Sequence, residues 1–153
     1  MAAVQSAGIL LWRRSSDGLE VFIAHMGGPF WAKKDAAAWS IPKGEYQSDE
    51  DALVAAKREF HEEIGVPAPA LDYVNLGEFR QSSGKVVTAF GAESDFEIAE
   101  VHSNTFAVEW PPRSGKIQQF PEIDRAEWMS AEDAAWRLVK GQVALIEALT
   151  AIV

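Results

Sequence analysis

Three glutamates fall within five positions of one another, at Glu59, Glu62 and Glu63, and their spacing could support chemistry. At about 100° per residue, a helix would place them on one face, at positions i, i+3 and i+4. Bare carboxylates at this spacing repel one another by roughly a few tenths of a kcal/mol per pair. Bound to a hard divalent cation, they become oxygen ligands of the type that magnesium prefers. One of them, left partly free, could accept a proton from an attacking water molecule.

The element that must position these carboxylates is a helix, which the sequence predicts over residues 48–64. Ser48, with Asp51 three residues further on, forms a capping-box pattern at its start. Gly65 suits a left-handed position after the last turn, and Pro67 prevents continuation. One stripe at helical spacing is apolar and should face the core; it consists of Leu53, Ala56, Phe60 and Ile64. The three glutamates then point away from the core.

The rest of the chain predicts a mixed sheet, which the helix over residues 48–64 and further helices cover. Residues 6–14 and 19–26 form a hairpin pattern about Asp17 and Gly18, and a loop follows up to about residue 38. Further strand-like segments are residues 71–80, 86–92, 105–110 and 123–129. Ser130 begins a helix to about Val139, and a last amphipathic helix follows Gly141. We therefore expect one α/β domain over residues 1–153, an α/β/α sandwich in layout.

Composition excludes several classes of site and partner. The 153 residues contain no cysteine, which excludes disulfides, thiolate zinc sites and cysteine nucleophiles. A net charge of -9 makes long nucleic acid an unlikely partner, because the surface repels phosphates. No apolar run is long enough to span a bilayer, and the basic pair Arg13 and Arg14 follows the first apolar stretch, unlike a secretory signal. A cytoplasmic protein is the default expectation, with the oligomeric state, monomer or homodimer, left open.

Seven of the 23 acidic residues lie within residues 44–66, which read GEYQSDEDALVAAKREFHEEIGV. This segment resembles the Nudix box in full: Gly44, Glu50, Arg58-Glu59, Glu62-Glu63 and Gly65 have its spacing. Phe60 departs from the usual aliphatic residue, which we interpret as a packing variant. The resemblance implies a hydrolase that cleaves nucleoside diphosphates linked to another group, with one to three divalent ions.

The resemblance also implies roles for individual residues. Glu59 and Glu63 match the principal metal ligands and Glu62 a frequent third, while a backbone carbonyl at Lys43 or Gly44 often completes the set. Arg58 and Glu50 match the pair that orients the ligand helix. Mg²⁺ is the implied cofactor, with Mn²⁺ as a possible substitute. Family members often take a further ligand or base from a later loop, for which we favour Glu122 over Glu109, although either could be a plain surface acid.

Residues outside the box should choose the substrate. Trp39 to Gly44, read as WSIPKG, resembles the dinucleoside polyphosphate and diphosphoinositol polyphosphate branches of the family, with Lys43 as a phosphate contact. Trp39 is either a substrate contact or a buried strand residue. The loop 28–34 joins aromatic and basic side chains, which suits stacking on a base beside phosphates, although the loop aromatics could instead cap the core; its candidate contacts are Trp31, Lys33 and Lys34. Arg113, with Lys116, could form a second basic loop over the site.

The family's substrate markers downstream of the box do not decide the matter, because Gln81 and Ser82 stand at those positions. We therefore expect a magnesium-dependent hydrolase of a nucleoside tri- or polyphosphate, with a dinucleoside polyphosphate as the favoured example. A Nudix-fold module that binds a nucleotide without cleaving it is one alternative. An RNA 5′-end pyrophosphohydrolase is another, which the acidic surface disfavours.

Overall fold

A seven-stranded mixed sheet forms the centre of the computed structural model, which describes residues 4–153 apart from 82 and 99. Five strands follow one another in the order β3-β2-β1-β6-β5, while β4 pairs with β1 and β9 pairs with β2. Strand β1 runs parallel to β6 and antiparallel to β2. The strands of this sheet are β1 (Gln5–Ser15), β2 (Gly18–Met26), β3 (Trp39–Ser40), β4 (Lys43–Glu45), β5 (Val74–Arg80), β6 (Val86–Glu93) and β9 (Ile123–Ser130).

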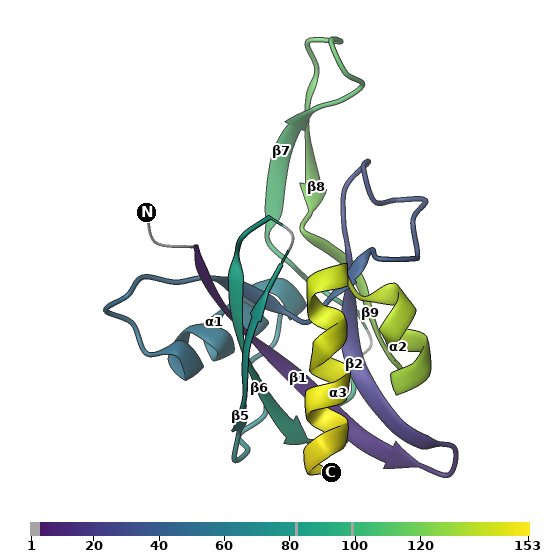
Figure 1. The fold of residues 1–153 in the computed structure, drawn as a ribbon. Helices are drawn as coiled ribbons and strands as arrows, with labels where there is room; N and C mark the ends of the chain where they lie inside the picture. Colours follow the sequence, from purple (N-terminus) through teal and green to yellow (C-terminus); the bar gives the residue numbers. More distant parts are fainter. Residues whose placement is uncertain (1–3, 82, 99) are drawn as a thin grey trace.

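Helices cover both faces of this sheet (Figure 1). Side chains alternate along a strand, so β1 sends Ile9 and Leu11 toward α1 (Ala52–Ile64) and Leu10 toward the opposite face. That opposite face packs against α2 (Ala131–Arg137) and α3 (Val143–Ile152). The expected α/β fold, a mixed sheet between helices, is confirmed. Within the described residues, no helix combines the length and apolar character needed to cross a membrane.

Helix α1 begins later than the capping-box pattern predicted. The helix starts at Ala52, because the side chain of Asp51 itself accepts a hydrogen bond from the backbone N–H of Val54, 3.1 Å away. Ser48 therefore lies outside the helix, and its predicted capping role is wrong. At the other end Gly65 has φ of 99°, the left-handed conformation expected of it, and its N–H bonds to the carbonyl of His61.

Strands β7 (Thr105–Glu109) and β8 (Ile117–Pro121) form a separate two-stranded antiparallel sheet that projects from the body of the molecule (Figure 1). The sequence predicted β7 but not β8. Strand β8 reads IQQFP, so it shows no alternation of apolar and polar residues, and every residue but Phe120 is exposed. The turn that joins the two strands lies at the outer end of the hairpin.

The C-terminal segment returns to the sheet. Helix α2 begins at Ser130, whose side chain accepts a hydrogen bond from Asp133 N at 3.0 Å, as the sequence predicted. The helix ends at Arg137, two residues before the predicted end. A short 3₁₀ turn, η1 (Lys140–Gln142), then leads into α3.

Candidate active site

Helix α1 presents the three glutamates on the side away from its core contacts. Phe60 and Ile64 are fully buried against the sheet and fix the rotation of the helix. Glu62 is exposed, whereas Glu59 and Glu63 are partly buried. The apolar stripe thus determines which way the carboxylates point, as the periodicity predicted.

Arg58 holds the first of these carboxylates in place. Its guanidinium donates to Glu50, to the Glu59 carboxylate at 3.2 Å and to the backbone carbonyl of Glu45 at 3.3 Å. Those two carboxylates, as ion-pair and hydrogen-bond partners, raise the pKa of Arg58 further above its ordinary value, so it stays charged. Arg58 therefore ties the start of the box to the ligand helix, the role that the resemblance implied.

The strand that enters the box lies directly against the helix. The backbone N–H of Lys43 donates to the Glu63 carboxylate at 3.0 Å. Gly44 faces Glu59 so closely that a Cβ at position 44 would overlap the Glu59 carboxylate. A side chain at this position would therefore displace the Glu59 carboxylate.

The electrostatics of this cluster favour protonation of its carboxylates. Burial raises the pKa of Glu63 to about 8, against the opposing hydrogen bond from the Lys43 backbone and the charge of Lys43. Burial also raises the pKa of Glu59 and of Glu122, and the nearby Glu62 raises both further. Burial lowers the pKa of Lys43. The acids are crowded together in partly desolvated positions, which a cation would relieve.

One open cavity of about 300 Å³ brings most of these groups together. It is lined by Ser6, Lys43, Gly44, Glu45, Glu59, Glu63, Lys85 and Glu122. Glu122 stands just before β9 and joins the box carboxylates. Glu109 instead lies on the projecting hairpin, where its carboxylate accepts a hydrogen bond from Arg113 N at 2.8 Å.

A second cavity, of about 250 Å³, shares Lys43, Glu63 and Glu122 with the first and continues toward apolar side chains. Its other wall contains Met26, Trp31 and Phe106. Phe106, on β7, was not singled out in the sequence, where it looked like an ordinary strand residue. Gly28 has φ of 95° and lies against the Phe106 ring, so the hairpin and the 27–34 loop meet here.

The other predicted substrate contacts occupy different environments. Trp39 is 1 % exposed, pairs with His25 in the sheet and donates from its indole to Asp35, which fits the buried-strand alternative. Lys33 and Lys34 are exposed on the loop, with Lys34 over the Trp31 ring. Arg113 is exposed in the hairpin turn and is absent from the cavities around the glutamates. The expectation of a basic loop over the site is therefore not met by Arg113 in this conformation.

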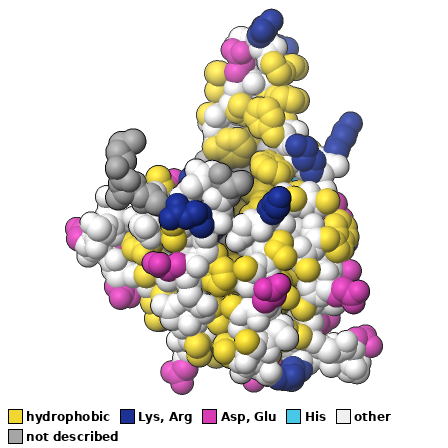
Figure 2. Space-filling view, in the orientation of Figure 1, with side chains coloured by type: hydrophobic (Ala, Val, Ile, Leu, Met, Phe, Trp, Pro, Cys, Tyr) yellow, Lys and Arg dark blue, Asp and Glu magenta, His cyan; other side chains and the backbone are white. Residues whose placement is uncertain are grey.

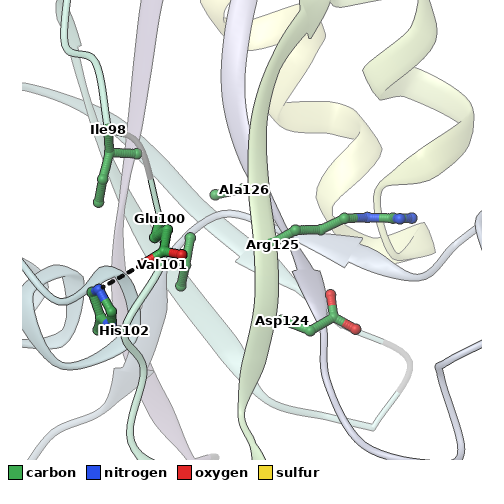
Figure 3. Close-up of a pocket in the computed structure, with 7 residues that line it drawn as sticks. All are labelled: Ile98, Glu100, Val101, His102, Asp124, Arg125 and Ala126. Carbon is green, nitrogen blue, oxygen red and sulfur yellow. Dashed lines mark ion pairs between the residues drawn. The ribbon is translucent and has the colours of Figure 1, made fainter.

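A third cavity, of about 380 Å³, contains no box glutamate (Figure 3). Ile98, Val101 and Ala126 form its apolar part, and His102 pairs with Glu100 at 3.5 Å. Asp124 is engaged in a 2.8 Å contact with the buried His25 ring. None of the residues that line this cavity belongs to the box, so we do not assign it to the site of the glutamates.

Comparison with known proteins decides the family. A family model described as NUDIX domain matches residues 3–149. The chain belongs to the NUDIX domain family. The predicted enzyme class, a Nudix pyrophosphohydrolase, is confirmed, without the identity of the substrate. Among curated proteins the comparison found no match.

Solved Nudix structures resemble the whole chain at low sequence identity. A Caenorhabditis elegans Ap4A hydrolase in a binary complex has a TM-score of 0.64 and 21 % identity, covering 97 % of this chain and 96 % of that one. The NUDIX domain of Shewanella oneidensis NrtR, complexed with ADP ribose, has a TM-score of 0.64 and 17 % identity, covering 99 % of this chain and 88 % of that one. RenU, a Nudix hydrolase from M. smegmatis, has a TM-score of 0.63 and 22 % identity, covering 97 % of this chain and 84 % of that one. At these identities the likeness shows the fold.

The residues of this Nudix site fit a divalent ion by chemistry and charge. They are hard oxygen donors, Glu59 and Glu63 have raised pKa values partly because of other carboxylates, and the absence of a side chain at Gly44 leaves room for the Glu59 carboxylate itself. Among the residues described here, no three carboxylate or imidazole groups are already close enough to share one ion. The fit therefore rests on the donor type and on the crowding of the carboxylates.

Proposed function

We propose that the chain is a magnesium-dependent hydrolase that cleaves a pyrophosphate linkage in a nucleoside tri- or polyphosphate, with a dinucleoside polyphosphate as the favoured example. The observation that carries this proposal is the cavity where Lys43, Glu59, Glu63 and Glu122 meet, next to one with an aromatic wall. One end suits phosphate groups with cations, and the other suits an apolar ring.

The residues would divide the work as follows. Glu59, Glu62 and Glu63, with a backbone carbonyl at Lys43 or Gly44, would hold Mg²⁺, which neutralises phosphate charge and activates water. Arg58 keeps the Glu59 carboxylate oriented. Glu63 already accepts a hydrogen bond from the Lys43 N–H. Glu62 or Glu122, which do not accept that bond, would therefore take the proton of the attacking water. Mn²⁺ would substitute for Mg²⁺.

Substrate contacts would come from the side of the 27–34 loop. Lys43 would contact a phosphate, and Trp31 would stack on a base, with Lys33 and Lys34 beside it. Phe106 forms the neighbouring wall. Two structural neighbours, an Ap4A hydrolase and an NrtR domain complexed with ADP ribose, are compatible with nucleotide ligands in this fold.

A nucleotide-binding module without hydrolysis is the second candidate, because one similar structure is a NUDIX domain bound to ADP ribose. All the box carboxylates are present in this chain, which favours the enzyme. Cleavage of RNA 5′ ends is disfavoured by the net charge of -9.

The test is a panel of nucleoside triphosphates, dinucleoside polyphosphates and ADP-ribose, each incubated with Mg²⁺ or Mn²⁺ and scored by product identity. Metal-dependent cleavage of a pyrophosphate bond, absent in EDTA, is the expected result. Binding of these nucleotides without any cleavage would instead support the module.

A further inference from the structure

Gln142, in the 3₁₀ turn η1, is fully buried although its side chain is polar. Its carbonyl oxygen accepts a hydrogen bond from the backbone N–H of Ile41 at 3.0 Å. Its amide nitrogen donates to the Ser40 hydroxyl at 2.9 Å and to the Gln81 side-chain oxygen at 3.1 Å. Every polar atom of the amide therefore has a partner, which a buried amide requires.

The segment that Gln142 contacts is the approach to the box. Strand β3 ends at Ser40 and β4 begins at Lys43, so Ile41 and Pro42 belong to neither strand. Pro42 has no N–H to donate. The carbonyl of Pro42 accepts from Ile9 N at 3.1 Å, while the N–H of Ile41 has the Gln142 oxygen as its partner. A side chain 101 residues away in sequence thus fixes this connection on one side, and β1 fixes it on the other.

The next residue after this connection is part of the site. Lys43 donates its backbone N–H to Glu63 at 3.0 Å, and Gly44 lies against Glu59. A hydrogen bond to a carboxylate weakens steeply as its distance and angle change, so a shift of residues 41–42 would weaken the Lys43 bond to Glu63 and alter the contact of Gly44 with Glu59. Ile41 is fully buried, so its backbone N–H requires an acceptor, and that acceptor is the Gln142 side-chain oxygen.

We propose that Gln142 is a positioning residue for the Nudix site: it sets the path of residues 40–43 and thereby the placement of the Lys43 N–H on Glu63. This inference rests on the proposed function for its catalytic consequences. Gln142 touches neither substrate nor metal, and it acts through the backbone. The C-terminal turn and the box, far apart in sequence, then form one functional unit.

The test compares two substitutions that remove hydrogen bonds from the same amide. Gln142→Met keeps the length of the side chain but leaves Ile41 N–H and Ser40 without their partner. Gln81→Met, the matched control, removes only the bond on the far side of Gln142 and leaves both bonds to residues 40–41.

Four readouts are measured well below the melting temperature of each variant: Mn²⁺ affinity, kcat, KM and hydrogen exchange of the Lys43 amide. We expect Gln142→Met to bind Mn²⁺ roughly 10- to 100-fold more weakly and to lose kcat in the same range, as outer positioning groups of metal sites do. The KM for nucleotide should change less. Hydrogen exchange of the Lys43 amide should become faster in the metal-free protein. Gln81→Met should lower thermal stability with little effect on the other readouts.

Unchanged Lys43 exchange in Gln142→Met would overturn the proposal, whatever the activity. Equal effects of Gln142→Met and Gln81→Met on Mn²⁺ affinity would do the same, since they would show general destabilisation. A wild-type protein that binds no Mn²⁺ and hydrolyses no nucleotide would contradict the proposed function, whereas the exchange of Lys43 would still decide whether Gln142 positions the backbone.

Discussion

The carboxylate face of α1 and the β7–β8 hairpin differ in how firmly the fold holds them. The glutamates stand on a helix whose opposite side is buried in the core, and Arg58 and the Lys43 backbone hold two of them. The hairpin forms its own small sheet and projects from the body, with hydrophobic side chains gathered along it (Figure 2). Ile117 is 66 % exposed on it, and Phe30 on the nearby loop is 55 % exposed.

Under the proposed function, this difference separates the residues that carry out the reaction from those that select the substrate. Groups that bind the metal and activate the water must be positioned to within a fraction of an ångström. They are therefore best placed on a helix or strand that packs against the core. Groups that select a substrate are commonly on loops, which vary more and move more. In this chain the two regions meet at one cavity, where Glu63 and Glu122 face Trp31 and Phe106.

The largest effect should come from the carboxylate face. We expect Glu62→Gln to lower kcat by roughly 10²- to 10⁴-fold, because it removes a candidate base and a candidate ligand charge. Glu62 is exposed, so the melting temperature should stay close to that of the wild type. Glu127→Gln, which removes an equal charge from an exposed site on β9, is the control. Normal turnover by Glu62→Gln on every substrate would show that the site is assigned wrongly.

Gly44→Ala should have the next largest effect, since its Cβ would displace the Glu59 carboxylate. We expect kcat to fall by roughly 10- to 100-fold, the range for a misplaced metal-site group. The check is a double-mutant cycle with Glu59→Ala. In the Glu59→Ala background the overlap is absent, so Gly44→Ala should cost little more. Additive losses would mean that Gly44 acts in another way.

Metal and pH should act together on the carboxylate face. Burial raises the pKa of Glu63 to about 8 in the folded protein, whereas the unfolded chain releases this proton near its ordinary pKa of 4.5. The metal-free fold therefore loses stability as the pH rises between these values. Mg²⁺ favours the ionised carboxylate, so its stabilisation should increase over the same window, reaching about 2.7 kcal/mol at 100 times its Kd.

Melting temperatures with Mg²⁺ and with EDTA, measured at about pH 6 and about pH 8.5, check this linkage. The difference between the two additives should be larger at the higher pH. In Glu63→Gln the pH dependence of that difference should be much smaller, because the titrating group is gone. A difference that shrinks as the pH rises would contradict the account.

The smallest effects should come from the recognition side. Trp31→Ala should raise KM for a base-containing substrate by roughly 5- to 100-fold, which corresponds to the loss of one stacking contact, while kcat changes little. Arg113→Ala, at the hairpin turn, should change KM by only about twofold, because exposed charges contribute little. Equal effects of the two substitutions, measured by steady-state kinetics, would show that the hairpin turn reaches the substrate.

The sequence predicted the parts of the molecule that local periodicity determines. The stripe with Phe60 and Ile64 set the carboxylate face, and the family match confirms the fold class and the hydrolase class. Local pattern could not show that Asp51, rather than Ser48, caps α1, because either side chain could reach an orphan N–H. It also could not show that a WSIPKG tryptophan is buried, since burial depends on strand β2 beside it.

Residues far apart in sequence were beyond prediction for the same reason. Phe106 reaches the cavity through the pairing of β7 with β8, and β8 has no alternating pattern. Gln142 contacts Ser40 and Ile41 across 102 and 101 residues, and a single glutamine in a turn carries no signal of this. Both depend on tertiary packing rather than on local propensity.

The most direct test of the central claim measures Mn²⁺ binding and pyrophosphate hydrolysis side by side in the wild type and in Glu63→Gln. The account predicts that both fall together by roughly 10²-fold or more while the circular dichroism spectrum is unchanged, because the ion supplies several kcal/mol of charge stabilisation. A Glu63→Gln protein that binds Mn²⁺ and hydrolyses its substrate like the wild type would contradict it.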